Sequence, residues 1–177
     1  MSKKYYDENE NILHIYSKHI VLTDECPSGR YPGDVLFDAL RVGNTLYGRL
    51  DAVSEVLKSS CKRLVDVKQG YARCSVAMLS DTCGITADEG LYRALTADGV
   101  DMLKIRPGHI SLDGCDYGFI GGAGGRLDDG EYAFFGDLLL HPDGEEMLAF
   151  AEKHKIKTVA LDSGMLRDHG GLVVIRK

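Results

Sequence analysis

The feature that most constrains the fold is a pattern of two strands, a helix and a third strand that recurs along the chain. In its first occurrence, "DVLFDAL" (34–40) and "TLYGRL" (45–50) predict two strands joined by the turn "RVGN". "DAVSEVLKSSC" (51–61) follows with apolar residues at helical spacing and an aspartate suited to the N-cap. "KRLVDV" (62–67) then predicts the return strand, which completes a ββαβ unit.

A second unit follows the same order. The strands "CSVAML" (74–79) and "TCGIT" (82–86) flank the turn "SD", and "DMLKI" (101–105) predicts the return strand. Between them, "ADEGLYRALTADG" (87–99) has an apolar stripe at helical spacing and a glycine placed like a C′ residue.

The third unit is the longest. "YGFIGGAGG" (117–125) leads through the turn "DDG" to the strand "EYAFFGDLLL" (131–140). "HPDGEEMLAFAEKHK" (141–155) has proline and acids in its first turn and basic residues in its last, which suits a helix. "KTVALDS" (157–163) predicts the return strand, and "GGLVVI" (170–175) would open a fourth unit.

These units predict one domain over residues 1–177 in the α/β class. A single unit cannot bury its apolar strands, so neighbouring units must pack around a shared axis with the helices outside. The predicted units cover residues 34–68, 74–106 and 117–161, with a partial unit formed by 170–177 and 1–33. Within that partial unit, "NILHIY" (11–16) and "HIVLT" (19–23) resemble short strands.

Composition excludes several classes of protein. The chain has 177 residues, and 44% of them are hydrophobic, which is enough for a buried core. A net charge of -6 argues against nucleic acid as a partner, because phosphates require a basic face. An acidic surface is compatible with a cationic small molecule, although a solvated surface explains it more simply.

The N-terminus and the cysteines predict a cytoplasmic protein. "MSKKYYDENENI" has no apolar stretch behind its lysines, and no run approaches the ~20 residues of a membrane helix. The five cysteines are scattered, form no C-x-x-C pair and lack zinc-finger spacing. Reduced thiols are therefore expected, with no membrane contact and no disulfides.

Tandem ββαβ units resemble the pentein fold, the β/α-propeller of guanidino-modifying enzymes such as the deiminases and amidinotransferases. "QGYARCSVAML" (69–79) and "PGHISLDGCDYGFIGGAGG" (107–125) are similar to segments of an uncharacterised bacterial family assigned to that fold. The resemblance covers residues 34–175 and implies five units around an axial cleft. Penteins usually close a ring, so three clear units imply a shortened propeller or completion by a homodimer.

The resemblance also implies candidate catalytic residues. Cys74 follows a glycine-containing turn at the start of a strand, as the nucleophile of the active relatives does, but in a different unit. The segment that corresponds to the relatives' cysteine has Leu172, Val173 and Val174 instead. His109 in "GHI" resembles their catalytic histidine and would act as the acid and base. Arg73 would lower the pKa of the Cys74 thiol, because positive charge favours a thiolate.

Residues around "GHI" extend the candidate site. Asp113 or Asp116 would orient His109 or hold a guanidinium through paired hydrogen bonds. Tyr117 and Phe119 suit either the wall of a planar ligand site or a hydrophobic core. Gly121 and Gly122 would permit close approach of the backbone, and with it a ligand.

Two other interpretations of residues 107–125 find less support. A phosphate-binding loop should open a helix, but "GGAGG" (121–125) leads to the turn "DDG". A metal site would combine His109, Asp113, Cys115 and Asp116, but their spacing matches no known ligand pattern. No cofactor or metal is predicted.

Two functions are therefore compatible with the sequence. The first is a non-catalytic protein that binds a small molecule, such as a cation, in an axial cleft. The alternative is a thiol-dependent hydrolase or transferase acting on a guanidine or amidine C–N bond, with Cys74 as nucleophile and His109 as acid and base.

Overall fold

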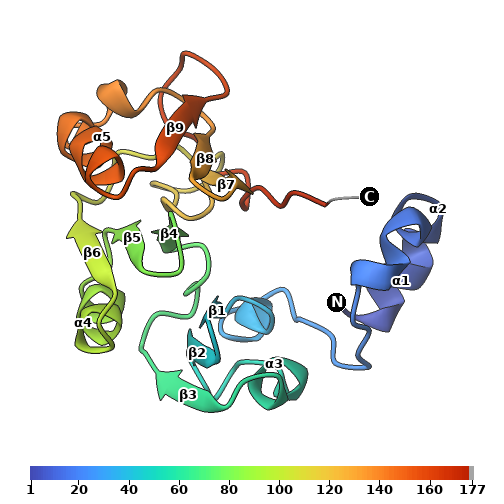
Figure 1. Cartoon of the computed structure of the whole chain (residues 1–177). Helices are drawn as coiled ribbons and strands as arrows, with labels where there is room; N and C mark the ends of the chain where they lie inside the picture. The colour runs from blue at the N-terminus through green and yellow to red at the C-terminus, as the bar shows by residue number, and fades with distance from the viewer. Residues whose placement is uncertain (176–177) are drawn as a thin grey trace.

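Three sheets of three strands each form the body of the protein in a computed structural model that describes residues 1–175 (Figure 1). In every sheet the first two strands are antiparallel, and the third pairs with the second in parallel. The first sheet contains β1 (Leu40–Val42), β2 (Thr45–Gly48) and β3 (Arg63–Asp66). The second contains β4 (Val76–Met78), β5 (Cys83–Thr86) and β6 (Asp101–Lys104). The third contains β7 (Gly124–Asp128), β8 (Glu131–Phe134) and β9 (Lys157–Ala160). The α/β class and the order of elements in the three predicted units are confirmed.

A helix connects the second and third strands of each sheet, as the parallel pairing requires. These helices are α3 (Glu55–Ser59), α4 (Glu89–Ala97) and α5 (Gly144–Lys153). In α4, the Asp88 side chain caps the helix by accepting a hydrogen bond from the Leu91 amide. Gly99, just past its end, has a φ of +84°, the conformation that glycine adopts without strain.

The three sheets follow one another along an arc (Figure 1). The first strands, β1, β4 and β7, lie on the inside of the arc, and the last strands, β3, β6 and β9, lie on the outside. β4 and β7 contact each other directly. Across residues 1–175 the sheets form an open arc and not a closed ring, so the finer prediction of a propeller is not confirmed.

Two apolar clusters join neighbouring units. The first lies between the first and second sheets and contains Leu40 and Tyr47 from one side and Leu91 and Leu95 of α4 from the other. Burial of these side chains couples the two units, since each sheet alone is too small to exclude water.

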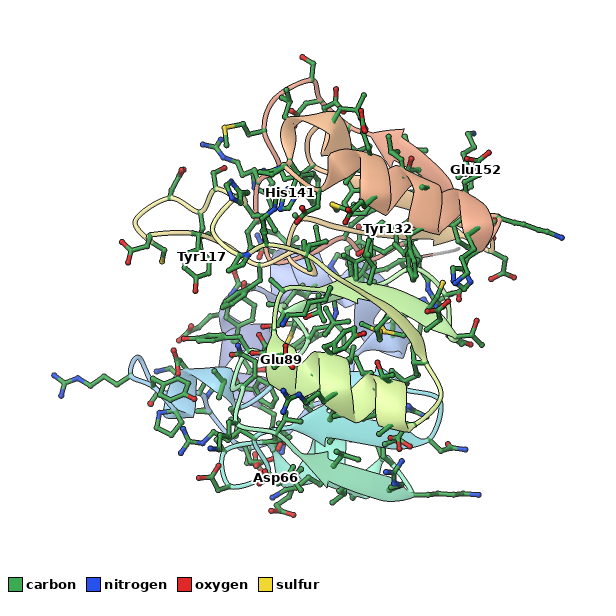
Figure 2. All side chains as sticks on the ribbon, turned by 90° about the vertical axis from the view of Figure 1, so that its left-hand side faces the viewer. Asp66, Glu89, Tyr117, Tyr132, His141 and Glu152 are labelled. Carbon is green, nitrogen blue, oxygen red and sulfur yellow. The ribbon has the colours of Figure 1, made fainter. Side chains whose placement is uncertain are left out.

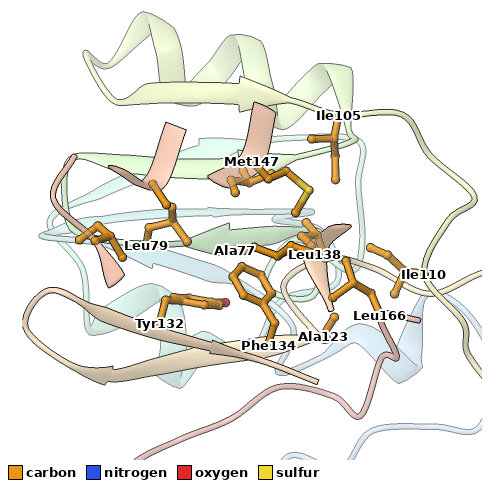
Figure 3. Close-up of a cluster of buried hydrophobic side chains, with 14 of the residues drawn as sticks. Ala77, Leu79, Ile105, Ile110, Ala123, Tyr132, Phe134, Leu138, Met147 and Leu166 are labelled. Carbon is orange, nitrogen blue, oxygen red and sulfur yellow. The ribbon is translucent and has the colours of Figure 1, made fainter. Parts of the chain in front are cut away.

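The second cluster repeats this arrangement between the second and third sheets (Figure 3). Ile85 of β5 faces it from the second unit, and Phe134 of β8 and Met147 of α5 face it from the third. In both clusters the helix of one unit packs against the sheet of the preceding unit. The units therefore share their packing arrangement as well as their order of elements.

The first predicted strand begins later than expected. Residues 34–40 were predicted as a strand, but Gly33–Val35 form a 3-10 turn, η2, and only Leu40 enters β1. The Asp38 amide donates to the Val35 carbonyl at 2.9 Å, which closes a turn here. The side chains of Asp34 and Asp38 bond to the next unit instead of alternating across a sheet. In the third unit β8 ends at Phe134, and residues 138–140 of the predicted strand form a 3-10 turn, η3 (Leu138–Leu140).

The N-terminal prediction was wrong. Residues 11–16, predicted as a strand, lie in α2 (Glu10–Leu13) and the 3-10 helix η1 (His14–His19), which follow α1 (Lys3–Glu8). Of the predicted strand at 19–23, His19 belongs to η1, and Thr23 forms only an isolated parallel bridge with Ser2. The Ser2 hydroxyl caps α1 by accepting from the Tyr5 amide, and none of these helices has a buried residue. Local hydrogen bonds therefore determine this segment, because no sheet edge lies alongside it to pair with a strand.

The predicted fourth strand is also absent from residues 170–175, which follow the third sheet without regular structure. The Leu172 amide nevertheless donates to the Gly124 carbonyl at 2.9 Å beside β7. The end of the predicted partial unit, 176–177, lies outside the described residues. No helix in residues 1–175 is long and apolar enough to cross a bilayer.

Candidate functional site

Cys74 lies on the inner side of the arc, just before β4. Its amide and that of Arg73 both donate to Oδ1 of Asp38, at 3.2 Å and 2.7 Å. Asp38 belongs to the first unit, so this carboxylate joins the start of β1 to the start of β4. The Cys74 side chain is thereby held next to a carboxylate that the sequence analysis did not select.

A second carboxylate, Asp168, approaches from the C-terminal side of the third unit. This residue is only 8% exposed. Its Oδ2 accepts the Phe119 amide at 2.8 Å, and its Oδ1 accepts the Gly170 amide at 2.8 Å. Both oxygens of this buried carboxylate are therefore occupied by backbone amides.

Gly121 and Gly122 hold the third unit close to the Cys74 backbone. Their amides donate to the Cys74 carbonyl at 2.7 Å and 3.1 Å. A Cβ at Gly121 would clash with the carbonyl oxygens of Arg73, Cys74 and Val76, and one at Gly122 would clash with the Asp168 carboxylate. The predicted close approach of the backbone at these glycines is present. It brings the third unit against the backbone around Cys74.

The environment of Cys74 disfavours a thiolate. Burial is the main cause that raises the pKa of the Cys74 thiol, followed by the charge and hydrogen bonding of Asp38 and the charge of Asp168. Arg73 acts in the predicted direction, but its effect on the pKa is the smallest of these. The Arg73 guanidinium instead donates to the Gly121 carbonyl at 2.9 Å. In this state Cys74 is a protonated thiol.

A row of aromatic rings borders the same region. Tyr71 stacks on Phe119 with ring centroids 5.8 Å apart, and Tyr31 and Tyr117 extend the row at its two ends. The Tyr71 hydroxyl donates to Oδ2 of Asp34 at 2.6 Å, and the hydrogen bond to Asp34 is the main cause that raises the Tyr71 pKa to about 12. Tyr117 is 45% exposed and lies on the loop between β6 and β7 (Figure 2). The row is exposed to solvent at both ends, at Tyr31 and Tyr117, and is not part of either buried cluster.

His109 contacts a different group of residues. Its ring meets the ring of His141 edge-on at 5.4 Å between centroids, beside the start of α5. Among the hydrogen bonds of residues 1–175, none joins His109 to the Cys74 sulfur. Nδ1 of His141 accepts the Asp143 amide at 3.0 Å, and burial lowers the pKa of His141. The predicted base and nucleophile are thus not bonded to each other in this structure.

The predicted acidic partners lie on the exposed part of the loop. Asp113 forms an ion pair with Arg167 at 3.1 Å, and both side chains are at least half exposed. Asp116 and Cys115 are exposed as well. No group of three or more potential metal ligands occurs in the described part of the chain.

Two cavities lie near this region. A groove of about 530 Å³ follows the inner strands β1, β4 and β7 and includes Arg73 and Leu172 in its lining. A smaller cavity of about 90 Å³ lies between the start of α4 and the loop before β7, bounded by Ser75, Asp88 and Phe119. Cys74 lines neither of them, although its neighbours Arg73 and Ser75 line one cavity each.

Sequence reasoning missed Asp38 and Asp168. A signal was present for Asp38, because two aspartates four residues apart are unusual in a half-buried strand and favour a turn. Asp168 precedes "HGG" without any periodic pattern around it. Only folding brings residues 38, 74 and 168 together.

Comparison with known proteins gives a family but no activity. No curated protein and no solved structure matches this chain. The model of a family of unknown function, DUF6873, matches residues 1–173. The chain therefore belongs to the DUF6873 family.

Proposed function

We propose that this protein binds a small molecule carrying a guanidinium or amidinium group, at the site formed by Asp38, Cys74 and Asp168. The observation that carries the proposal is the pair of carboxylates beside Cys74. Neither carboxylate forms an ion pair with a basic side chain of residues 1–175. Carboxylates inside a protein are normally matched by a positive charge or by several hydrogen bonds.

The geometry of the carboxylates suits a planar cation. Both backbone amides near Cys74 bond to Oδ1 of Asp38, so neither of them uses its Oδ2. A guanidinium presents pairs of N–H groups that match carboxylate oxygens. The Tyr71 and Phe119 rings add faces on which such a cation can stack.

The arrangement of the units supports the same proposal. We propose that the three ββαβ units belong to a β/α-propeller of the guanidino-modifying type, with the site at its axis. The innermost position of β1, β4 and β7 supports this, since Asp38 and Cys74 immediately precede two of these strands.

Binding is tested by thermal unfolding with methylguanidine and with methylurea, its neutral counterpart. Methylguanidine should raise the unfolding temperature of the native protein, because a ligand that binds only the folded state stabilises it. Methylurea should not. Asp38→Asn keeps an oxygen for both amides but removes the charge, so it should abolish the shift. Asp116→Asn, on the exposed loop, is the matched control and should respond like the native protein.

Equal responses to methylguanidine and methylurea would refute a cation site. A full response in Asp38→Asn would move the site elsewhere. Asp168→Asn is less informative, because both oxygens of Asp168 accept amides and one bond would be lost.

Covalent chemistry at Cys74 is a second candidate, favoured by the position of the thiol between the carboxylates. A cation held there would offset their charges and lower the thiol pKa, which favours attack on the bound carbon. His109 would then have to approach the thiol to transfer a proton. The test compares alkylation of Cys74 by 2-chloroacetamidine, a cation, and by neutral 2-chloroacetamide. The ratio of the two rates should be much larger for Cys74 than for exposed Cys26; equal ratios would exclude directed chemistry.

A further inference from the structure

The small cavity beside α4 contains a polar group without a partner. The Ser75 hydroxyl is buried, its residue being 2% exposed, and it has no hydrogen-bond partner among the described residues. A buried polar group without a partner destabilises a protein. Ser75 lines the cavity of about 90 Å³, so a molecule in that cavity is the natural partner for the hydroxyl.

The cavity is large enough for a small ligand. A water molecule occupies about 30 Å³, so the space corresponds to roughly three waters. The remaining polar lining decides what kind of ligand fits there.

That lining carries an unmatched negative charge. Asp88 accepts the Leu91 amide at 2.8 Å and the Gln69 side-chain amide at 3.1 Å, but forms no ion pair with a basic side chain in residues 1–175. Gln69 is fixed in turn, because its Oε1 accepts the Tyr71 amide.

Arg106 also borders the cavity, but its charge is already matched. Its Nε donates to Oδ1 of Asp143 at 2.6 Å, and its terminal nitrogen donates to the Pro142 carbonyl at 2.7 Å. The charges at the cavity therefore favour a cation over an anion.

Aromatic rings complete the wall. Tyr117 and Phe119 line the cavity and meet edge-on at 6.3 Å between centroids. Aromatic faces attract ammonium groups, and a hydroxyl and a carboxylate accept their N–H bonds.

We propose that this cavity binds a small primary ammonium group, with Ser75 and Asp88 accepting its hydrogen bonds. The site is separate from the carboxylate pair at Cys74 and goes beyond the function proposed above. Phe119 borders both, since its amide bonds to Asp168 and its residue lines the cavity.

The test uses methylammonium as the probe, with binding measured by calorimetry and by thermal unfolding of the whole chain. Tetramethylammonium is the control ion, because it has the same charge but is bulkier and has no N–H donor. Methylammonium should bind, and tetramethylammonium should not.

Two substitutions locate the site. Ser75→Ala should weaken methylammonium binding at least fivefold without lowering the stability of the free protein, since the hydroxyl has no protein partner there. Asp88→Asn should weaken binding by at least as much, and asparagine still caps α4. Unchanged binding in both variants, or no binding to the native protein, would overturn the inference.

Asp38→Asn separates this inference from the proposed function. It should leave methylammonium binding intact while abolishing the response to methylguanidine. Loss of methylammonium binding in Asp38→Asn would assign that cation to the Cys74 site and overturn the second site.

Discussion

Cys74 and His109 were predicted as one catalytic pair, yet they lie in contrasting surroundings. Cys74 is held by backbone hydrogen bonds that join three parts of the chain, and it is flanked by Asp38 and Asp168. His109 belongs to a loop and contacts His141 near the start of α5.

The two residues were selected from different kinds of sequence signal. Cys74 was selected from its place in the repeat, and the repeat is what the fold preserves. His109 was selected from a short motif, "GHI", which says nothing about where a loop directs its side chain. The role of each residue in a site stays a prediction, and the following experiments test the contrast between the two regions, from the largest expected effect to the smallest.

Packing at Cys74 should be intolerant of added volume. Gly121→Ala places a methyl group against three backbone carbonyl oxygens, none of which can rotate away. We expect the free energy of unfolding to fall by about 2–3 kcal/mol, measured by urea denaturation. Gly29→Ala, where nothing lies within 4 Å, is the control and should change it by less than about 0.5 kcal/mol. Equal effects would show that the glycine junction is loosely packed.

The charge of Asp38 should control the reactivity of Cys74. Asp38→Asn removes the nearest negative charge, so the thiol pKa should fall and the thiolate population rise. The rate of iodoacetamide labelling at pH 8, followed by mass spectrometry, should increase by about threefold to tenfold, since one pKa unit is a tenfold change. His109→Gln should leave this rate unchanged. A slower rate in His109→Gln would instead show that His109 acts on the thiol, as the sequence predicted.

The His141 environment should make stability depend on pH. Burial lowers the pKa of this histidine below its ordinary value of 6.5, so the unfolded chain takes up the proton first as the pH falls. The free energy of unfolding should therefore fall by up to about 1 kcal/mol between pH 7 and pH 5. His141→Asn, which can still accept the Asp143 amide, should lose less over that range. An equal loss in His141→Asn would show that other groups titrate; the exposed His14→Asn is the control and should behave like the native protein.

The smallest effect is expected on the exposed loop. Asp113→Asn breaks the ion pair with Arg167, in which the two side chains are 87% and 50% exposed. Exposed pairs contribute about 0–1 kcal/mol, so the unfolding midpoint in urea should hardly change. A loss of methylguanidine binding in this variant would show that Asp113 contributes to the cation site. The regions around Cys74 and His109 would then no longer differ in this respect.

Much of the body could be predicted from sequence because its signals are local. The helix around Leu91 and Leu95 has the apolar spacing, the capping aspartate and the terminal glycine of an α-helix. The N-terminal residues have equally short signals, but a strand needs a partner, and none lies beside residues 11–16. The prediction failed there because strand formation depends on distant pairing.

The sequence alone determined the repeating ββαβ order, the boundaries of the three helices within the units to within a few residues, and the closeness of the backbone at Gly121 and Gly122. Only the tertiary structure decided which charged side chains lie near Cys74. Asp38, Cys74 and Asp168 are far apart in the chain. The amide bond from Cys74 to Asp38 and the effect of the Asp168 charge on the Cys74 thiol both depend on how successive units turn about the inner strands. The burial of the Ser75 hydroxyl away from any protein partner was equally hidden, since it arises only from packing.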